Sequence, residues 1–298
     1  MAQDSASRVT EAPQPRVLIV VSSAGVNPWL EIEEEAQAPI IRDLMGDTSE
    51  VIWMEGNREL LPLIRFRVLD WLIRQQLGIM YRRWYWFRRI YKNSWDKYEW
   101  NAIGSGFLRK LLENNASGAK PQAQSSRVTR DFPIQMSLAG ARTLDVLRYS
   151  LQQHEFDYLL RLTSTCLPVP SELRALLGGL PRTRVYGGVQ AKFARTSFVS
   201  GAAVLLSRDV VEGICENSRS FSYLVFEDVG LGRIVRKKNL ADLIVIPRVD
   251  VTSIDQIPGL VSASWPKAPV VRCKAEHPLT TRSGPVVELM KAVAPHLS

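Results

Sequence analysis

A run of five apolar residues near the amino end, Val17–Val21, constrains the fold more than any other feature of the sequence. The run offers no polar side chain to solvent and is rich in β-branched residues, so it predicts a strand that is covered on both faces. Ser22, Ser23 and Gly25 follow directly and predict a turn at the end of this strand. A strand of this kind belongs in a parallel sheet with helices on both sides.

Later segments repeat this pattern and alternate with helical ones. Strands are expected over Glu50–Gly56, Phe156–Leu162, Arg184–Val189 and Val204–Leu206. Helices are expected over Thr143–His154, over Ser171–Leu177 with Ser171 as its cap, and from about Ser207 onward. Strands that alternate with helices predict an α/β fold with a mixed, mainly parallel sheet flanked by helices.

Length and composition place most of the chain in one domain. With 298 residues, of which 46% are hydrophobic, the chain is large enough for a full core. Residues 1–15 are polar and aperiodic and predict a disordered lead, and residues 16–298 predict a single domain. No apolar run approaches the roughly 18 residues of a membrane-spanning helix, and the first residues lack the apolar part of a signal peptide. We therefore expect a cytoplasmic protein.

An insertion of different character is expected at about residues 58–130. Within it, residues 81–100 hold nine of the 25 Phe, Trp and Tyr residues of the chain. As a helix, this segment would place aromatic residues on one arc and basic residues opposite: Trp84, Trp86, Phe87, Ile90 and Tyr91 against Arg82, Arg88, Arg89 and Lys92. Three interpretations stay open: a structural helix, docking on an anionic membrane surface, and contact with nucleic acid. Residues 114–130 are small and polar and predict a loop.

The charge and the cysteines narrow the choice of partner and ligand. The formal net charge of +8 favours an anionic partner, such as nucleic acid, a membrane surface or a phosphorylated small molecule. Cys166, Cys215 and Cys273 are widely spaced and match no metal-binding pattern, so we expect free buried thiols and no metal site.

Polar residues follow the strand at 156–162 and suggest a binding site. Arg161, Thr163, Ser164 and Thr165 stand at its carboxyl end, which should share one sheet edge with Ser22 and Ser23. Ligands of open α/β sheets bind outside this edge, and hydroxyls with an arginine suit a sugar, a ribose or a phosphate. The alternative is that the hydroxyls only cap a turn before Pro168.

Two later motifs add candidates for catalysis. Ser200 and Gly201 form a small-residue turn before a strand, where the glycine would let the backbone approach a ligand closely. Glu227 and Asp228, in the motif FEDVG, precede a helical run. Carboxylates there are favoured by the helix N-terminus, and one of them can instead serve as a general base.

In this order, the segments DYLL, FVSGAAVLLS and FEDVGLG resemble the inverting GT-A glycosyltransferases of the β-1,3-galactosyltransferase and Fringe type. The resemblance covers most of residues 16–252, but not the insertion. It implies a GT-A-like fold and transfer of a hexosyl or N-acetylhexosaminyl group from a nucleotide-sugar donor. The acceptor would be a glycan or lipid-linked hydroxyl, as in polysaccharide biosynthesis. The resemblance also makes Asp228, or Glu227, the base.

The chain departs from this family where metal-dependent members carry aspartates, because Thr163, Ser164 and Thr165 stand there. This substitution is similar to the metal-independent branching N-acetylglucosaminyltransferases, which neutralise the donor diphosphate with basic side chains. The matching candidates lie in an apparently irregular tail: Arg272, Lys274, His277 and Arg282. Donor binding is thus assigned to Ser22, Ser23, Arg161, Thr163, Ser164, Thr165, Ser200, Gly201, Arg272, Lys274 and Arg282, without a cofactor.

Other functions compete with this one. A GT-A-shaped module that only binds glycan or nucleotide, or a membrane-surface or nucleic-acid adaptor built on residues 81–100, would fit the same sequence. The enzyme is favoured, located in the cytoplasm or peripherally on the inner face of a membrane, with no nucleic-acid partner. A glycoside hydrolase is disfavoured, because adjacent residues seldom flank a sugar at the spacing of about 5–9.5 Å that its two carboxylates need.

Overall fold

A computed structural model describes residues 14–22, 29–45, 50–56, 127–130, 139–193, 196–221, 226–262, 267–275 and 283–297. Residues 1–13 of the expected lead, Ser23 and nearly all of the insertion, including residues 81–100, lie outside these ranges. Within them, no helix has the length and apolar character that crossing a membrane requires.

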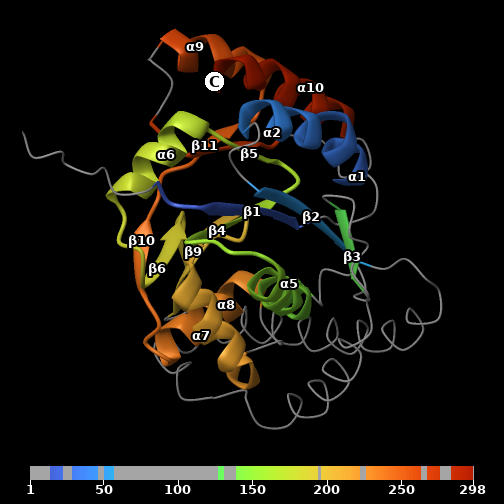
Figure 1. Cartoon of the computed structure of the whole chain (residues 1–298). Coiled ribbons are helices and arrows are strands. Elements are labelled where there is room, and N and C mark those ends of the chain that lie inside the picture. The colour runs from blue at the N-terminus through green and yellow to red at the C-terminus, as the bar shows by residue number, and fades with distance from the viewer. Residues whose placement is uncertain are drawn as a thin grey trace, which may run out of the picture.

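A seven-stranded sheet forms the centre of the described structure (Figure 1). Its order is β10 (Asp242–Val245), β6 (Val185–Gly188), β9 (Ala203–Ser207), β4 (Tyr158–Thr163), β1 (Val17–Ser22), β2 (Glu50–Gly56) and β3 (Arg127–Arg130). β9 runs antiparallel to both of its neighbours, and the other neighbouring pairs are parallel. The predicted mixed, mainly parallel sheet is confirmed.

Helices cover both faces of this sheet (Figure 1). One face carries α5 (Ala139–Gln153), α7 (Arg208–Glu216) and α8 (Glu227–Lys237). The other carries α1 (Trp29–Ile32), a π-helix (Glu33–Gln37), α2 (Ala38–Met45), α6 (Pro170–Gly179), α9 (Ile257–Ser262) and α10 (Ser283–Val293).

Two small sheets and three short 3₁₀ helices complete the described part of the chain. β11 (Val249–Val251), β12 (Val270–Cys273) and β5 (Cys166–Pro168) form a three-stranded sheet on the α10 side. β7 (Gln190–Phe193) and β8 (Thr196–Val199) form a hairpin. The 3₁₀ helices are Ser218–Ser220, Ile254–Gln256 and Ala294–His296.

The alternation of side chains along β4 explains how a charged residue enters the core. Leu160 and Leu162 join the hydrophobic cluster under α10, whereas Leu159 joins the cluster on the α5 side. Because successive side chains of a strand point to opposite faces, Arg161 points toward the α5 and α8 side. Its buried guanidinium therefore needs a partner from those helices.

Several predicted boundaries and elements are wrong. α6 begins at Pro170 after Val169, with no side-chain cap, so Ser171 lies inside the helix. Proline is suited to this first position because it has no amide hydrogen to satisfy and its φ is already helical. α5 begins at Ala139 rather than Thr143. Part of the predicted loop at 114–130 forms strand β3, and the start of the predicted irregular tail forms β12.

Candidate functional site

The carboxyl ends of β1 and β4 lie side by side, as predicted. Ser22 and Thr163 are register partners in the parallel pair. The Ser22 hydroxyl oxygen is buried without a hydrogen-bond partner, and the Thr163 hydroxyl lies 3.4 Å from that of Thr165. Ser164 and Thr165 are buried. This edge therefore holds several hydroxyl residues, of which Ser22 and Thr163 are half-buried.

Gln37 fixes the turn after β4. Its side-chain amide donates hydrogen bonds of 2.8 Å to the carbonyl oxygens of Thr163 and Cys166. Gln37 is fully buried in the π-helix, so the turn is held from the α2 side of the sheet. The hydroxyl residues of this turn are part of a fixed structure, which meets the preorganisation that a ligand site requires.

Arg161 links three elements on the other face of the sheet. It forms an ion pair with Glu227, and its guanidinium donates to the Thr143 hydroxyl at 3.1 Å and to the Gly201 carbonyl at 3.0 Å. Thr143 in turn donates to Glu227 at 2.6 Å. The Arg161 side chain is 4% exposed and that of Glu227 is 15% exposed. Both terminal nitrogens of Arg161 are thus occupied by groups of the protein itself.

Asp228 has a different environment from its neighbour Glu227. One carboxylate oxygen accepts a hydrogen bond from the Val229 amide at 2.9 Å, and the other accepts one from the Gly201 amide at 3.3 Å. The prediction placed both acids just before the helix; they stand inside its first turn, where the helix dipole stabilises negative charge. A side chain at Gly201 would contact both Asp228 and Arg161, because its Cβ would lie 3.5 Å from the Asp228 Cβ and 3.4 Å from an Arg161 nitrogen.

Two further charged residues lie within electrostatic range of this cluster and were not predicted. Burial lowers the pKa of the Arg142 guanidinium. The charge of Glu227 raises this pKa, that of Arg161 lowers it further, and that of Glu33 raises it. Glu33 is fully buried in the π-helix. Glu33 belongs to the acidic run EIEEEAQ, which is typical of a solvent-exposed surface. Only the spacing of four residues between Glu33 and Gln37 predicts that these two side chains share one helix face.

A second charged cluster lies on the neighbouring strands β11 and β12, where Asp250 and Arg272 are register partners. Arg248 pairs with Asp250 through two hydrogen bonds, of 2.6 Å and 3.0 Å, and approaches the Ser200 hydroxyl at 3.5 Å. Arg272 lies 3.9 Å from the same carboxylate of Asp250. Arg272 therefore projects from a strand and has a carboxylate partner, whereas Lys274 is exposed. His277 and Arg282 lie outside the described residues.

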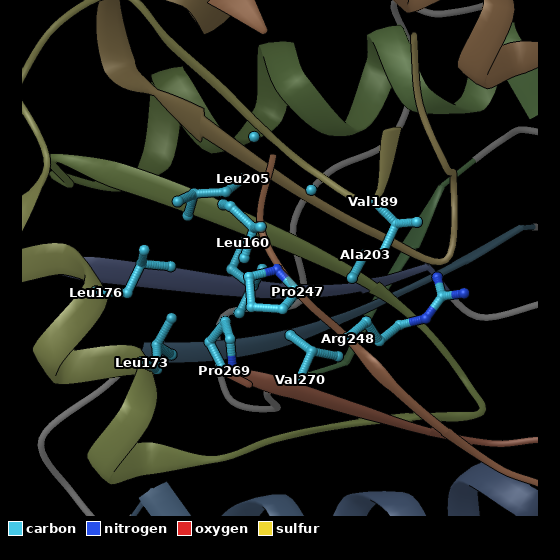
Figure 2. A pocket seen from close by; sticks show the side chains of 13 residues that line it. Leu160, Leu173, Leu176, Val189, Ala203, Leu205, Pro247, Arg248, Pro269 and Val270 are labelled. Carbon is cyan, nitrogen blue, oxygen red and sulfur yellow. The ribbon is translucent and has the colours of Figure 1, made fainter. Parts of the chain in front are cut away.

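Next to this cluster is an apolar hollow between the central sheet and α6 (Figure 2). Leu160, Leu205 and Ala203 come from the sheet, and Leu173 and Leu176 from α6. Arg248 is the one charged residue among the described residues that line it, and its guanidinium points away from α6 (Figure 2). The described residues that line the hollow do not include Glu227 or Asp228.

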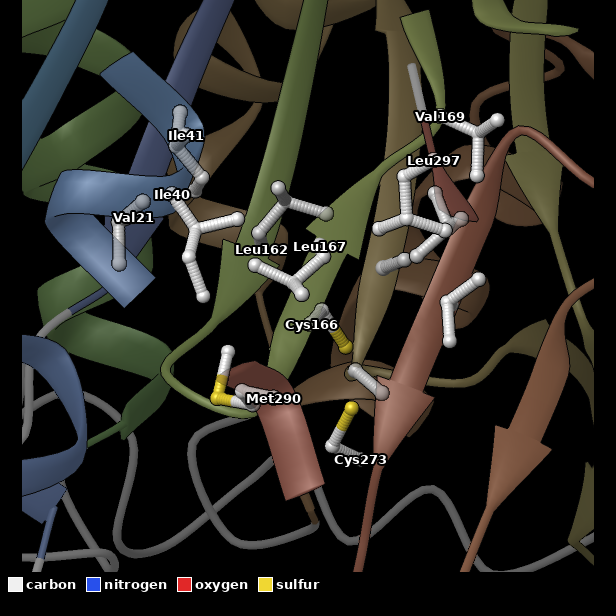
Figure 3. Packing of buried hydrophobic residues seen from close by; sticks show 14 of the residues in the cluster. Val21, Ile40, Ile41, Leu162, Cys166, Leu167, Val169, Cys273, Met290 and Leu297 are labelled. Carbon is white, nitrogen blue, oxygen red and sulfur yellow. The ribbon is translucent and has the colours of Figure 1, made fainter. Parts of the chain in front are cut away.

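The three cysteines form no disulfide and pack in or against the hydrophobic core. Cys166 and Cys273 are buried among apolar side chains of the α10 cluster (Figure 3), and burial raises the pKa of both thiols. Cys215 is half-buried, and burial raises its pKa to about 11. Buried free thiols are thus confirmed for Cys166 and Cys273. Among the described residues, no group of three or more His, Cys, Asp or Glu side chains is arranged to hold a metal ion.

Comparison with known proteins gives only distant similarities. No protein-family model matches the chain, and neither does any curated protein. The galactosyltransferase LgtC, in complex with donor and acceptor sugar analogues, is 9% identical, with a TM-score of 0.40, over 95% of this chain and 96% of that one. An inositol-1-phosphate CTP transferase from T. maritima is 11% identical, with a TM-score of 0.43, over 96% and 99%. The Pyrobaculum calidifontis mannosyltransferase PcManGT, in complex with GDP-Man and Mn²⁺, is 13% identical, with a TM-score of 0.39, over 79% and 56%.

Proposed function

We propose that this protein is an inverting, GT-A-like glycosyltransferase that moves a sugar from a nucleotide-sugar donor to a hydroxyl of a glycan or lipid-linked acceptor. The observation that carries the proposal is the unequal pair of carboxylates at the start of α8. Glu227 is bound by Arg161 and Thr143, whereas among the described residues Asp228 accepts hydrogen bonds from two backbone amides and from no side chain. The two acids therefore have different roles, one structural and one chemical.

Asp228 is the base in this proposal. The amides of Gly201 and Val229 fix the orientation of its carboxylate. A carboxylate has about four lone-pair sites, so two remain to accept a proton from an acceptor hydroxyl. That oxygen attacks the anomeric carbon as the bond from this carbon to the donor phosphate breaks. The nucleoside diphosphate leaves, and the proton passes to Asp228.

Arg161 acts as a positioning residue and not as a direct donor ligand. Its contacts with Glu227, Thr143 and Gly201 join the start of α8 to the Ser200–Gly201 turn. The hydroxyls of Ser22, Thr163 and Ser200 remain as groups for the donor. Arg272, Lys274 and Arg282 compensate the charge of the departing diphosphate without a metal ion, since hydroxyls are poor substitutes for carboxylates around a divalent cation.

The proposal is tested by turnover with UDP-, GDP-, CMP- and dTDP-sugars, with and without EDTA. We expect turnover with at least one donor, and we expect it to survive EDTA. Asp228→Asn should lower kcat by at least about 10²-fold while the donor Kd changes little, because the variant keeps shape but loses basicity.

Asp255→Asn, an exposed carboxylate in a 3₁₀ helix, is the matched control and should behave as the wild type. Donor binding without any turnover would instead identify a binding module of the same fold. Unchanged turnover in Asp228→Asn would remove Asp228 from the mechanism.

A further inference from the structure

The cluster of Arg248, Asp250 and Arg272 carries one more positive than negative charge. Two guanidinium groups share a single carboxylate, with the Arg248 side chain 9% exposed and that of Arg272 27% exposed. The Nε atom of Arg272 is also buried without a hydrogen-bond partner. Partly buried positive charge and an unsatisfied donor both cost free energy, and a bound anion would reduce both costs.

The geometry of the cluster suits an anion with several oxygen atoms. Arginine presents a planar fork of donors that can hold two oxygens of one phosphate at once. Arg248 already uses such a fork, because two of its nitrogens bind the two carboxylate oxygens of Asp250. A phosphate group can take over this arrangement. Asp250, whose side chain is 43% exposed, is the member of the cluster best placed to turn toward solvent.

The cluster is connected to the proposed base through a single turn. The third guanidinium nitrogen of Arg248 lies 3.5 Å from the Ser200 hydroxyl. The next residue, Gly201, donates its amide hydrogen to Asp228. An anion held by Arg248 would therefore lie beside the same turn that orients Asp228, as a leaving diphosphate must.

We infer that Arg248, Arg272 and the Ser200 hydroxyl form a diphosphate-binding site, and that Asp250 is a built-in counter-ion which the diphosphate displaces. Naming the ligand as the donor diphosphate rests on the proposed function. The site itself does not, since it requires only an anion with several oxygens. Arg248 and Asp250 thereby join the functional residues as a ligand and its internal competitor.

The experiment is a calorimetric titration of the full chain with inorganic pyrophosphate at low salt in the presence of EDTA. We expect binding by the wild type and at least a tenfold weaker affinity for Arg248→Gln. Asp250→Asn should bind several-fold more tightly, because it keeps the shape of the side chain but removes the competing charge. A cluster that only holds β11 and β12 together predicts the opposite for Asp250→Asn, namely equal or weaker binding.

Two controls keep the test decisive. Arg182→Gln removes another ion-paired arginine, the partner of Asp157, and should leave pyrophosphate binding unchanged. Ser200→Ala removes one hydroxyl and no charge. It should weaken pyrophosphate binding a few-fold, and it keeps the test open if the Asp250 variant proves unstable. Unchanged affinity in both Arg248→Gln and Ser200→Ala would overturn the inference.

A competition arm identifies the ligand and separates the two proposals. Pyrophosphate should be displaced by the nucleoside diphosphate of the active donor. Pyrophosphate binding with the predicted mutant pattern but no turnover would contradict only the proposed function. Turnover that depends on Asp228 while Arg248→Gln leaves pyrophosphate binding intact would contradict only this inference.

Discussion

At the scale of residues, the ion pair between Arg161 and Glu227 has the greatest expected effect on stability. Glu227→Gln keeps the shape of the side chain but leaves the buried guanidinium without its counter-charge. Removing one partner of a buried pair costs about 3–5 kcal/mol, so we expect a loss of this size in the free energy of unfolding, measured by urea denaturation.

The control is the pair of Arg208 and Glu212, four residues apart on α7, whose side chains are 29% and 47% exposed. Glu212→Gln should cost no more than about 0.5 kcal/mol, because water reaches both groups of this pair. In Glu227→Gln combined with Arg161→Met, the loss should be clearly smaller than the sum of the two single losses, since the double variant removes both charges of the pair. Additive losses would show that the two side chains do not depend on each other.

Sequence reasoning found the residues at this scale more readily than it found their partners. FEDVG indicated Glu227 and Asp228, and the end of a strand indicated Arg161. That Arg161 would bind Glu227 could not be read from the chain, since the two are 66 positions apart and meet only through the sheet. Arg248 was missed for the same reason. Glu33 was missed because an acidic run normally faces water.

At the scale of elements, the position of α8 depends on a close approach to β8. A Cβ atom at Gly232 would lie 2.5 Å from the Cβ of Phe198 and 3.0 Å from the Ser197 carbonyl oxygen. Because backbone atoms cannot easily move aside, we expect Gly232→Ala to lower the free energy of unfolding by about 1–3 kcal/mol. Alanine normally stabilises a helix relative to glycine, so a loss of stability in Gly232→Ala would indicate the close contact with β8.

Gly178 of α6 is the control, because a Cβ there would meet no atom within 4 Å. Gly178→Ala should leave stability unchanged or raise it by up to about 1 kcal/mol. In the assay for Asp228, Gly232→Ala should also lower turnover, since α8 carries that carboxylate at its first turn. A stability as high in Gly232→Ala as in Gly178→Ala would mean that α8 tolerates a wider separation from β8.

The predicted elements were accurate where a strand or helix carries its own pattern. The apolar runs gave β1 and β2, and β2 spans the predicted Glu50–Gly56. β12 was predicted as irregular tail because VVRC is short and is followed by polar residues. Its strand character comes from pairing with β5 and β11, which are distant in sequence. β3 likewise depends on pairing with β2.

At the scale of the whole molecule, the formal net charge of +8 makes attraction to anionic surfaces a general property. Net charge attracts the whole protein to an anionic surface, whereas a membrane-binding site depends on particular side chains. For the basic and aromatic segment at 81–100, which lies outside the described residues, docking on an anionic membrane is one of the three interpretations that stay open. Tryptophan beside arginine and lysine on one helix suits the headgroup region of an anionic bilayer.

The test compares two variants of equal charge in sedimentation with vesicles that contain anionic phosphatidylserine. One replaces Arg82, Arg88, Arg89 and Lys92 by Gln, and the other replaces the exposed residues Arg174, Lys238, Lys267 and Lys291 by Gln. Each lowers the formal net charge from +8 to +4. We expect the first variant to be released and the second to stay largely bound, with wild-type binding weakening as salt screens the attraction. Equal release of both would reduce the effect to net charge, and a wild type that ignores such vesicles at low salt would leave residues 81–100 as a structural insertion.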